Sequence, residues 1–166
     1  LDDFKTLNDT QGHRVGDLLL VEVARRLKNC VRVEDCVARL GGDEFVVLLE
    51  DLGSLLNESA AHAEGVGQKI LDEVAKPFLL EGFEYHCSAS IGVTLFSGRD
   101  ESVDELLKRA DAAMYRSKMA GRNTLRFFDP AMQSNLEARA ALEADLRRAL
   151  PEQQLELFFQ GQVDGE

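Results

Sequence analysis

The feature that most constrains this chain is a short turn sequence, Gly41-Gly42-Asp43-Glu44, which separates two apolar runs at residues 37–40 and 45–49. Paired glycines allow a tight turn with positive φ, so the two runs are predicted to form a β-hairpin. Two adjacent carboxylates at such a turn repel each other unless a cation or hydrogen-bond donors neutralise them. A divalent metal that bridges to phosphate oxygens would do so, whereas a solvated acidic turn is the ordinary alternative.

The hydrophobic periodicity along the chain predicts helices alternating with short strands. Helices are predicted over residues 16–30, 57–76, 103–118 and 133–150, a half-buried strand over residues 83–93, and a further strand over residues 124–128. This order predicts an α/β protein, specifically an α+β sandwich with a mixed, largely antiparallel sheet flanked by helices. The apolar run Leu155–Phe159 predicts either the start of a second domain or a strand that pairs with the first sheet.

Composition limits the possible partners. The chain of 166 residues has a net charge of −11, which argues against non-specific binding to nucleic acids or to anionic membranes. A nucleotide is still possible, because a few cations and a metal ion can hold one. Three cysteines without metal-site spacing predict free thiols in a reducing cytoplasm. No apolar run approaches a membrane span, and a first residue other than Met predicts a piece of a longer protein.

Three residue pairs outside the turn have the chemistry to bind a nucleotide. Asn8 and Asp17 can be a turn residue and a helix N-cap, or they can read the edge of guanine, because Asp accepts from its N–H groups. Lys118 and Arg122 can be a simple charge pair at a helix end or a clamp on triphosphate oxygens. The third pair is Arg32 and Asp35, which can form a surface ion pair or bind guanine and phosphate.

Taken in order, these motifs resemble the GGDEF domain of diguanylate cyclases. The resemblance covers residues 1–129 and rests on Phe4-Lys5-Thr6-Leu7-Asn8-Asp9, Gly12-His13, Gly16-Asp17, Ala38-Arg39-Leu40, Gly41 to Phe45, Ser90-Ile91-Gly92-Val93, Ala110-Asp111 with Met114-Tyr115 and Lys118, and Gly121-Arg122-Asn123. It implies a palm-like nucleotidyl-cyclase fold. Residues 130–150 and 151–166 resemble the linker helix and the first strand of an EAL phosphodiesterase domain. Gly161 departs from that pattern, which usually has proline there.

The resemblance implies an enzyme that condenses two GTP molecules into cyclic di-GMP and releases pyrophosphate, with two protomers facing each other. It implies that Mg²⁺ or Mn²⁺ is the cofactor. By family analogy Asn8 and Asp17 bind guanine, Asp43 binds metal, Glu44 binds the second metal or assists loss of the 3′-OH proton, Lys5, Lys118 and Arg122 contact phosphates, and Gly41 and Gly42 leave room for the nucleotide.

The spacing of Arg32 and Asp35 before Gly41 matches the family's RxxD inhibitory site, so product feedback inhibition is expected. The second arginine that often completes such a site is not evident.

One departure concerns the metal. The family has a metal-binding Asp immediately before the position of Leu1, at the end of a first strand that is mostly missing here. The isolated fragment is therefore expected to be weak or inactive, with the complete domain lying in the cytoplasm next to an EAL domain.

Two alternatives stay open. One is a catalytically silent module that binds GTP or cyclic di-GMP and controls a phosphodiesterase domain. The other is a different nucleotidyl cyclase or a polymerase palm, against which the Asn8/Asp17 and Arg32/Asp35 pairs argue.

Overall fold

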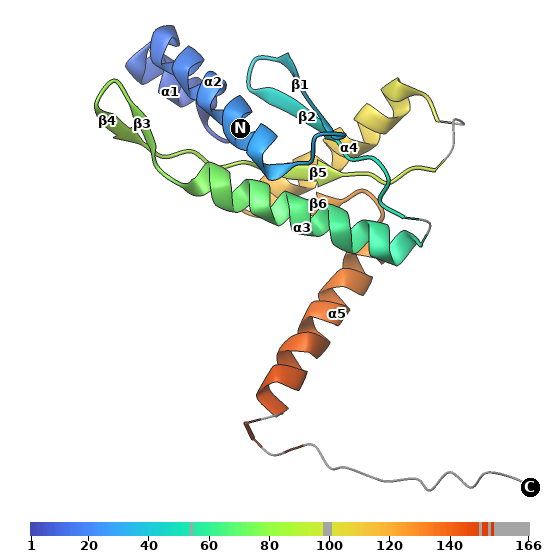
Figure 1. Ribbon diagram of the computed structural model, residues 1–166. Coiled ribbons are helices and arrows are strands. Elements are labelled where there is room, and N and C mark those ends of the chain that lie inside the picture. Colours follow the sequence, from blue (N-terminus) through green and yellow to red (C-terminus); the bar gives the residue numbers. More distant parts are fainter. Residues whose placement is uncertain (54, 98–100, 150, 153, 155–166) are drawn as a thin grey trace, which may run out of the picture. The chain divides into compact units, whose positions relative to one another are not determined.

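The computed structural model describes residues 1–53, 55–97, 101–149, 151, 152 and 154. Two units are distinguished, Leu1–Gln133 and Ser134–Glu166. The first unit mixes helices with short strands, which confirms the predicted α/β class (Figure 1). In the part of the chain that is described, no helix is long and apolar enough to cross a membrane.

The elements follow one another in the order that Figure 1 labels. They are α1 (Phe4–Gln11), α2 (His13–Cys30), β1 (Cys36–Gly41), β2 (Glu44–Leu48), α3 (Leu56–Ala75), β3 (Phe78–Leu80), β4 (Phe83–Tyr85), β5 (Ile91–Val93), α4 (Val103–Met119), β6 (Leu125–Phe127) and α5 (Pro130–Ala149). The predicted helix over residues 133–150 corresponds to α5. The strand-like run Leu155–Phe159 lies outside the described residues, so the proposed start of an EAL domain stays a prediction.

The strands pair as three two-stranded sheets among the described residues, where the sequence predicted one largely antiparallel sheet. β1 pairs with β2 and β3 with β4, both antiparallel, whereas β5 pairs with β6 in parallel. The alternating segment 83–93 is therefore two strands, β4 and β5, that have different partners. Periodicity could not reveal this break, because both strands continue the same alternation of side chains.

The first helix was not predicted. Asn8 lies inside α1 and Asp17 lies inside α2, so the simpler roles of turn residue and N-cap are both wrong. The break between the two helices is at Gly12, whose φ of 84° is accessible to glycine without strain. This break lets α2 begin at His13 and places Asn8 and Asp17 on two successive helices.

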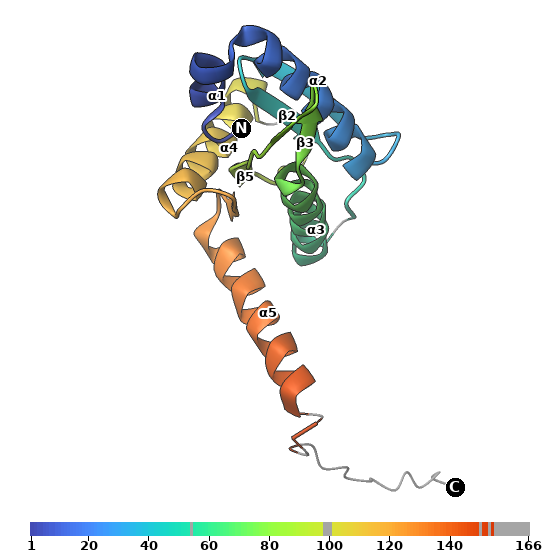
Figure 2. The same ribbon diagram turned by 90° about the vertical axis from the view of Figure 1, so that its left-hand side faces the viewer.

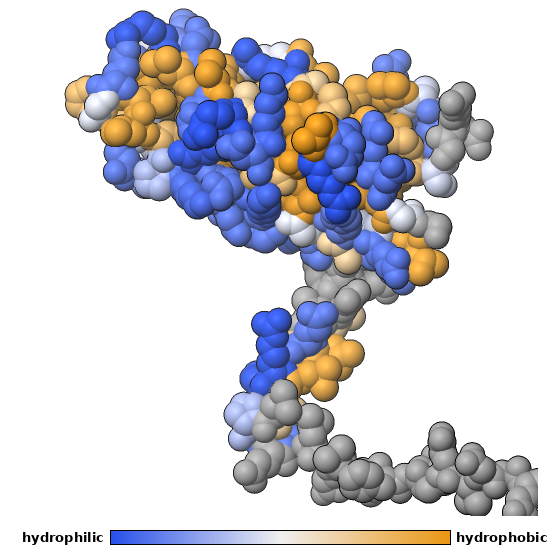
Figure 3. Space-filling model, in the orientation of Figure 1, coloured by the Kyte–Doolittle hydropathy of each residue, from blue (hydrophilic) through white to orange (hydrophobic). Residues whose placement is uncertain are grey.

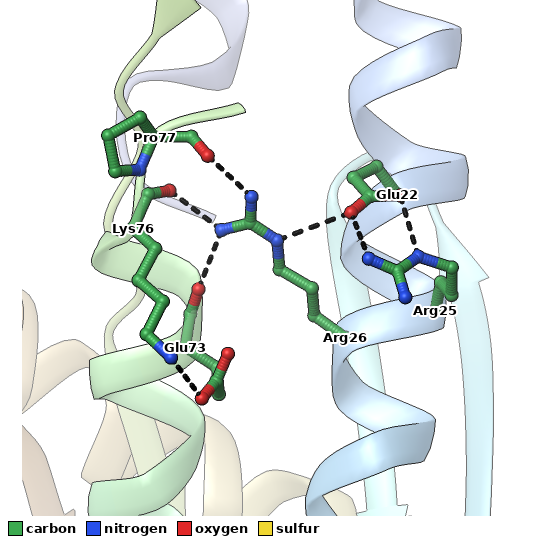
Figure 4. A network of polar contacts seen from close by, with 6 residues as sticks. All are labelled: Glu22, Arg25, Arg26, Glu73, Lys76 and Pro77. Carbon is green, nitrogen blue, oxygen red and sulfur yellow. Dashed lines mark hydrogen bonds and ion pairs between the residues drawn. The ribbon is translucent and has the colours of Figure 1, made fainter. Parts of the chain in front are cut away.

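The side chain of Arg26 connects helices α2 and α3. Only 12 % of this side chain is exposed to solvent. Its guanidinium donates to the backbone carbonyls of Glu73, Lys76 and Pro77 at 2.6–2.7 Å (Figure 4). These carbonyls lie at the end of α3 and just beyond it, where helical backbone acceptors lack partners. The guanidinium also lies 3.6 Å from the centroid of the Phe78 ring, a cation–π contact.

The pair β5–β6 lies between α4 and α3, as Figures 1 and 2 both show. The side chains that fill this region and the interface with α2 are almost fully buried: Leu19, Val23, Val74, Phe78 and Phe127. Gly92 in β5 lies directly against α4, because a Cβ added there would come within 2.0 Å of the Ala110 carbonyl oxygen. Only glycine allows this approach of strand to helix.

Exposed apolar side chains gather at the tip of the β3–β4 hairpin. Leu79 is 76 % exposed and Phe83 is 68 % exposed, and Figure 3 shows apolar surface at that tip. Neither residue lines the two hollows described below. This surface is therefore separate from the candidate binding residues.

We expect Gly92→Ala to destabilise the protein by about 3 kcal/mol or more, because the new methyl group overlaps backbone atoms that cannot rotate away. Gly65→Ala in α3 is the matched control, since its added Cβ meets no atom within 4 Å. That substitution should be neutral or stabilise the protein by up to about 1 kcal/mol. Urea unfolding measures both. Equal stability of the two variants would contradict the described packing of β5 on α4.

Candidate functional site

The turn of the β1–β2 hairpin presents Asp43 and Glu44. Gly42 has a φ of 50°, and its carbonyl accepts a hydrogen bond of 2.9 Å from Nε of Arg39. Gly41 pairs with Glu44 beyond a shift in the register of the two strands. Asp43 is half-buried and Glu44 is exposed. The hairpin and its acidic turn are thus where the sequence predicted them.

The backbone nitrogen of Leu1 lies next to Asp43. It donates to the Asp43 carbonyl oxygen at 3.0 Å and lies 3.3 Å from Oδ2 of the same residue. The first residues of the described chain are therefore packed against the acidic turn.

Asp2 is a buried carboxylate that connects three parts of the fold. Its oxygens accept hydrogen bonds from the hydroxyls of Ser88 at 2.7 Å and Ser90 at 2.8 Å, and from the backbone N–H of Asn123 at 3.4 Å. Its own N–H donates to the Ser88 carbonyl at 2.9 Å. Burial alone would raise the pKa of Asp2, but these hydrogen bonds together outweigh it and hold the pKa below its ordinary value.

The candidate phosphate residues Lys118 and Arg122 lie at the end of α4. The chain turns there through Gly121, Arg122 and Asn123, all with positive φ. The N–H of Arg122 donates to the Ser117 carbonyl at 3.2 Å, which closes the helix. Asp2 accepts from the Asn123 N–H and is adjacent to Leu1, whose backbone nitrogen donates to the Asp43 carbonyl. The turn after α4 is thus connected through two residues to the acidic hairpin turn.

The candidate guanine residues are neighbours across the contact of α1 with α2. The side chain of Asn8 lies against Gly16, since a Cβ added to Gly16 would be 1.9 Å from its Oδ1. This buried oxygen has no hydrogen-bond partner among the described residues. Asp17 follows Gly16 and lines a hollow of about 430 Å³ between α2 and the β1–β2 hairpin, with Val37 and Phe45 also in its wall.

A second hollow, of about 410 Å³, contains the Arg32/Asp35 pair and shares no lining residue with the first. Oδ2 of Asp35 accepts from the backbone N–H of Arg32 at 2.8 Å, and its Oδ1 accepts from the N–H of Glu50 at 3.2 Å. Asp35 thus fixes the loop that carries Arg32. Two further residues of this hollow were missed by the sequence analysis, His62 and Lys69 on α3.

The donors present fit a magnesium-type ion only in part. No cluster of three or more His, Cys, Asp or Glu side chains occurs in the described portion of the chain. Asp43 and Glu44 are adjacent oxygen donors on the hairpin turn. Mg²⁺ is often held by one or two carboxylates, with water and substrate phosphates completing its shell, so this donor set is compatible with it.

The remaining predicted site residue is Lys5, and one thiol, that of Cys87, lies near Asp2. Lys5 is exposed in the first turn of α1. Cys87 lies near Asp2, and burial raises the pKa of its thiol to about 11, so this thiol is neutral at physiological pH. It is therefore unsuited to act as a nucleophile.

Comparison with known proteins finds a family model and relatives that both concern diguanylate cyclases. The family model "Diguanylate cyclase, GGDEF domain" matches residues 1–124. The bifunctional diguanylate cyclase/cyclic di-GMP phosphodiesterase MucR of Pseudomonas aeruginosa is 43 % identical over 163 residues, which are 98 % of this chain and 23 % of MucR. The chain thus spans less than a quarter of the length of that relative.

Two solved structures have the same fold. An EAL/GGDEF domain protein from M. capsulatus matches with a TM-score of 0.68 at 42 % identity, over 78 % of this chain and 81 % of that one. The GGDEF domain of DgcB from Caulobacter crescentus, solved in complex with c-di-GMP, matches with a TM-score of 0.63 at 27 % identity, over 76 % of this chain and 72 % of that one.

We expect Asp2→Asn to lower the free energy of unfolding by about 1–3 kcal/mol at neutral pH, because an amide cannot accept from all three donors. The lowered pKa of Asp2 means that its ionised form stabilises the fold above the unfolded value of 3.8. That stabilisation is lost as the pH falls through the folded pKa. The difference in the free energy of unfolding between wild type and variant should therefore shrink below about pH 4.

Urea unfolding between about pH 3 and pH 7 tests this expectation. Asp3→Asn is the control, since Asp3 is exposed and asparagine tolerates its φ of 55°. A difference in unfolding free energy between wild type and Asp2→Asn that stays constant over the whole pH range would contradict the role assigned to this carboxylate.

Proposed function

The chain belongs to the diguanylate cyclase, or GGDEF, family, and from this premise we propose that it condenses two GTP molecules into cyclic di-GMP and releases pyrophosphate. The resemblance inferred from the motifs is thereby confirmed at the level of the family. The observation that carries the proposed activity is the β1–β2 turn, which presents the half-buried Asp43 and the exposed Glu44 as adjacent carboxylates.

The proposed reaction is an in-line transfer in which the 3′-hydroxyl of one GTP attacks the α-phosphorus of the other. One GTP is held by each of two protomers, so a homodimer is required and each chain supplies half of the site. Such reactions depend mainly on positioning the reactants and neutralising phosphate charge. Glu44 is proposed to assist loss of the 3′-OH proton or to bind metal, and Lys5, Lys118 and Arg122 to contact the phosphates.

Guanine is proposed to bind to Asn8 and Asp17. Asn8 on α1 lies against Gly16, and the exposed Asp17 is the next residue of α2, so the two residues come from neighbouring helices. Guanine offers N–H donors on one edge, which suits acceptors of this kind, whereas adenine offers fewer. The nearby hollow beside Asp17 has apolar walls that suit the faces of a purine ring. Gly41 and Gly42 are proposed to leave room for the phosphates, since an added Cβ meets nothing there.

Asp43 and Glu44 are the residues proposed to hold Mg²⁺ or Mn²⁺. A bound divalent ion would supply charge neutralisation at the triphosphate. The carboxylates themselves are strong hydrogen-bond acceptors, so in this site they also orient water and donor groups around the nucleotide.

The proposal extends to the larger polypeptide. MucR carries both cyclase and phosphodiesterase activities in its name, and this chain matches nearly a quarter of it, including the segment that resembles the start of an EAL domain. We propose a composite parent with a covalently linked EAL domain and with this domain in the cytoplasm, where GTP is available. The alternative is a regulatory module that binds GTP or cyclic di-GMP without synthesis and controls the EAL domain.

Asp43→Ala and Glu44→Ala should each lower synthesis of cyclic di-GMP at least about 100-fold, because each removes a carboxylate from the proposed reaction centre. Asp72→Ala is the control, as Asp72 is an exposed carboxylate on α3. Chromatography of the products formed from GTP and Mg²⁺ measures the rates, with ATP as the comparison substrate.

The assay uses the chain and, in parallel, the chain joined to the segment that precedes the matching residues in MucR, because the family pattern has a metal-binding Asp just before the position of Leu1. Synthesis that persists in both variants would overturn the assignment of the active site. No product from either protein, with GTP or cyclic di-GMP still bound, would favour the regulatory module.

We further propose that Arg32 and Asp35 form a product-inhibition site. Arg32→Ala should leave the initial rate unchanged and weaken inhibition by cyclic di-GMP about 10- to 100-fold, the effect of losing a charged hydrogen bond. Arg25→Ala is the control, since Arg25 pairs with Glu22 on the exposed side of α2. Unchanged product inhibition in the Arg32 variant would count against this site.

A further inference from the structure

The hollow that contains Arg32 is built by three parts of the chain. The end of α2 contributes Cys30, the following loop contributes Arg32 and Asp35, and α3 contributes His62 and Lys69. The hollow holds about 410 Å³ and is open to solvent on one side, since Arg32 is exposed and His62 is half-buried. It combines two positive charges with the carboxylate of Asp35 and one imidazole.

His62 is in direct contact with Arg32. Nη2 of Arg32 lies 3.2 Å from Nε2 of His62. A guanidinium has donors only, so Nε2 must accept this hydrogen bond. The imidazole in this arrangement is therefore neutral and carries its single proton on Nδ1. Protonation of Nε2 would remove the hydrogen bond and bring two cations face to face.

The other charged groups around His62 are engaged in hydrogen bonds, except Glu58, which is on the same face of α3. Both oxygens of Asp35 accept from backbone N–H groups. Nζ of Lys69 donates to the carbonyls of Asn29 and Cys30 at the end of α2, at 3.2 and 3.1 Å. Burial raises the pKa of the Cys30 thiol, so it is neutral at physiological pH. Glu58 stands four residues before His62 on α3 and is exposed.

We propose that His62 couples the binding of an anionic ligand in this hollow to the uptake of one proton. The inference rests on the proposed inhibitory function of Arg32 and Asp35, and its ligand class is a phosphodiester such as cyclic di-GMP. A phosphate oxygen that accepts from Arg32 releases Nε2 of His62. The released nitrogen then takes a proton from solvent and donates to the same anion, so Arg32 and His62 clamp it from two sides.

The sign of the pH effect follows from this exchange. Histidine is the side chain whose charge changes between about pH 5 and pH 8. If the anion favours the protonated imidazole, the ligand binds more tightly as the pH falls. Phosphodiesters keep a constant charge over this range, so the ligand itself adds no such dependence. Feedback inhibition would then strengthen when the surroundings become more acidic.

The first measurement is calorimetric titration of the chain with cyclic di-GMP at about pH 6 and about pH 8, at constant ionic strength. We expect binding about five- to tenfold tighter at the lower pH, because the bound anion favours the charged imidazole. Repeating the titration in buffers of different ionisation enthalpy counts the protons taken up. That count should be about half a proton near neutral pH in the wild-type chain, the uptake that a roughly five- to tenfold change in affinity over about two pH units requires.

Two substitutions at His62 separate a titrating role from a structural one. His62→Gln keeps a hydrogen-bond acceptor but cannot gain charge, so binding should be as weak at pH 6 as at pH 8, without proton uptake. His62→Arg carries a permanent charge, so binding should be tight at both pH values. His86→Gln is the control, because His86 lies 3.1 Å from Glu84 at the end of β4 and does not line the hollow.

The outcomes distinguish the inference from the function on which it rests. Binding that requires Arg32 but shows no proton uptake, or the same pH dependence in wild type and His62→Gln, overturns the role of His62 and leaves the inhibitory site standing. Binding that is unaffected by Arg32→Ala, or no binding at any pH, overturns the inhibitory site itself. Proton uptake of about half a proton near neutral pH that disappears in His62→Gln supports the proposal.

Discussion

The buried carboxylate of Asp2 is the interaction on which the arrangement of the candidate active site depends. An ionised group at this depth is tolerated only because the hydroxyls of Ser88 and Ser90 and the N–H of Asn123 all donate to it. These three donors come from the segment that leads into β5 and from the turn after α4. Since Asp2 follows Leu1, whose backbone nitrogen donates to the Asp43 carbonyl, one carboxylate aligns the acidic turn with the phosphate-contact candidates at the end of α4.

Helix α2 contributes residues to both hollows described above. Asp17, near its beginning, lines the hollow proposed for substrate, and Cys30, at its end, lines the hollow that contains Arg32. The side chain of Arg26 fixes this helix on α3 through three backbone carbonyls (Figure 4). Because α3 carries His62 and Lys69, these hydrogen bonds of Arg26 also determine which side chains meet in the second hollow. The geometry of the proposed inhibitory site is therefore a consequence of helix packing.

Local patterns predicted much of this fold. The glycine pair and its flanking apolar runs predicted the β1–β2 hairpin, and periodicity predicted α2, α3 and α4 within a few residues. The α1 helix was missed because its eight residues bury only Phe4, which leaves no apolar stripe to detect. The break between β4 and β5 was missed because alternation reports which face is buried but not which strand is the partner.

The sequence by itself determined the family and the candidate residues for the chemistry, because the turn at Gly41–Glu44 and the ordered motifs around it are local patterns of residue types. Only the tertiary structure decided how these residues are held and what surrounds them. Ser88 Oγ reaches Asp2 across 86 positions of sequence, and His62 meets Arg32 across 30. No local pattern encodes such contacts, since they arise when separate helices and strands pack and bring distant polar groups to one place.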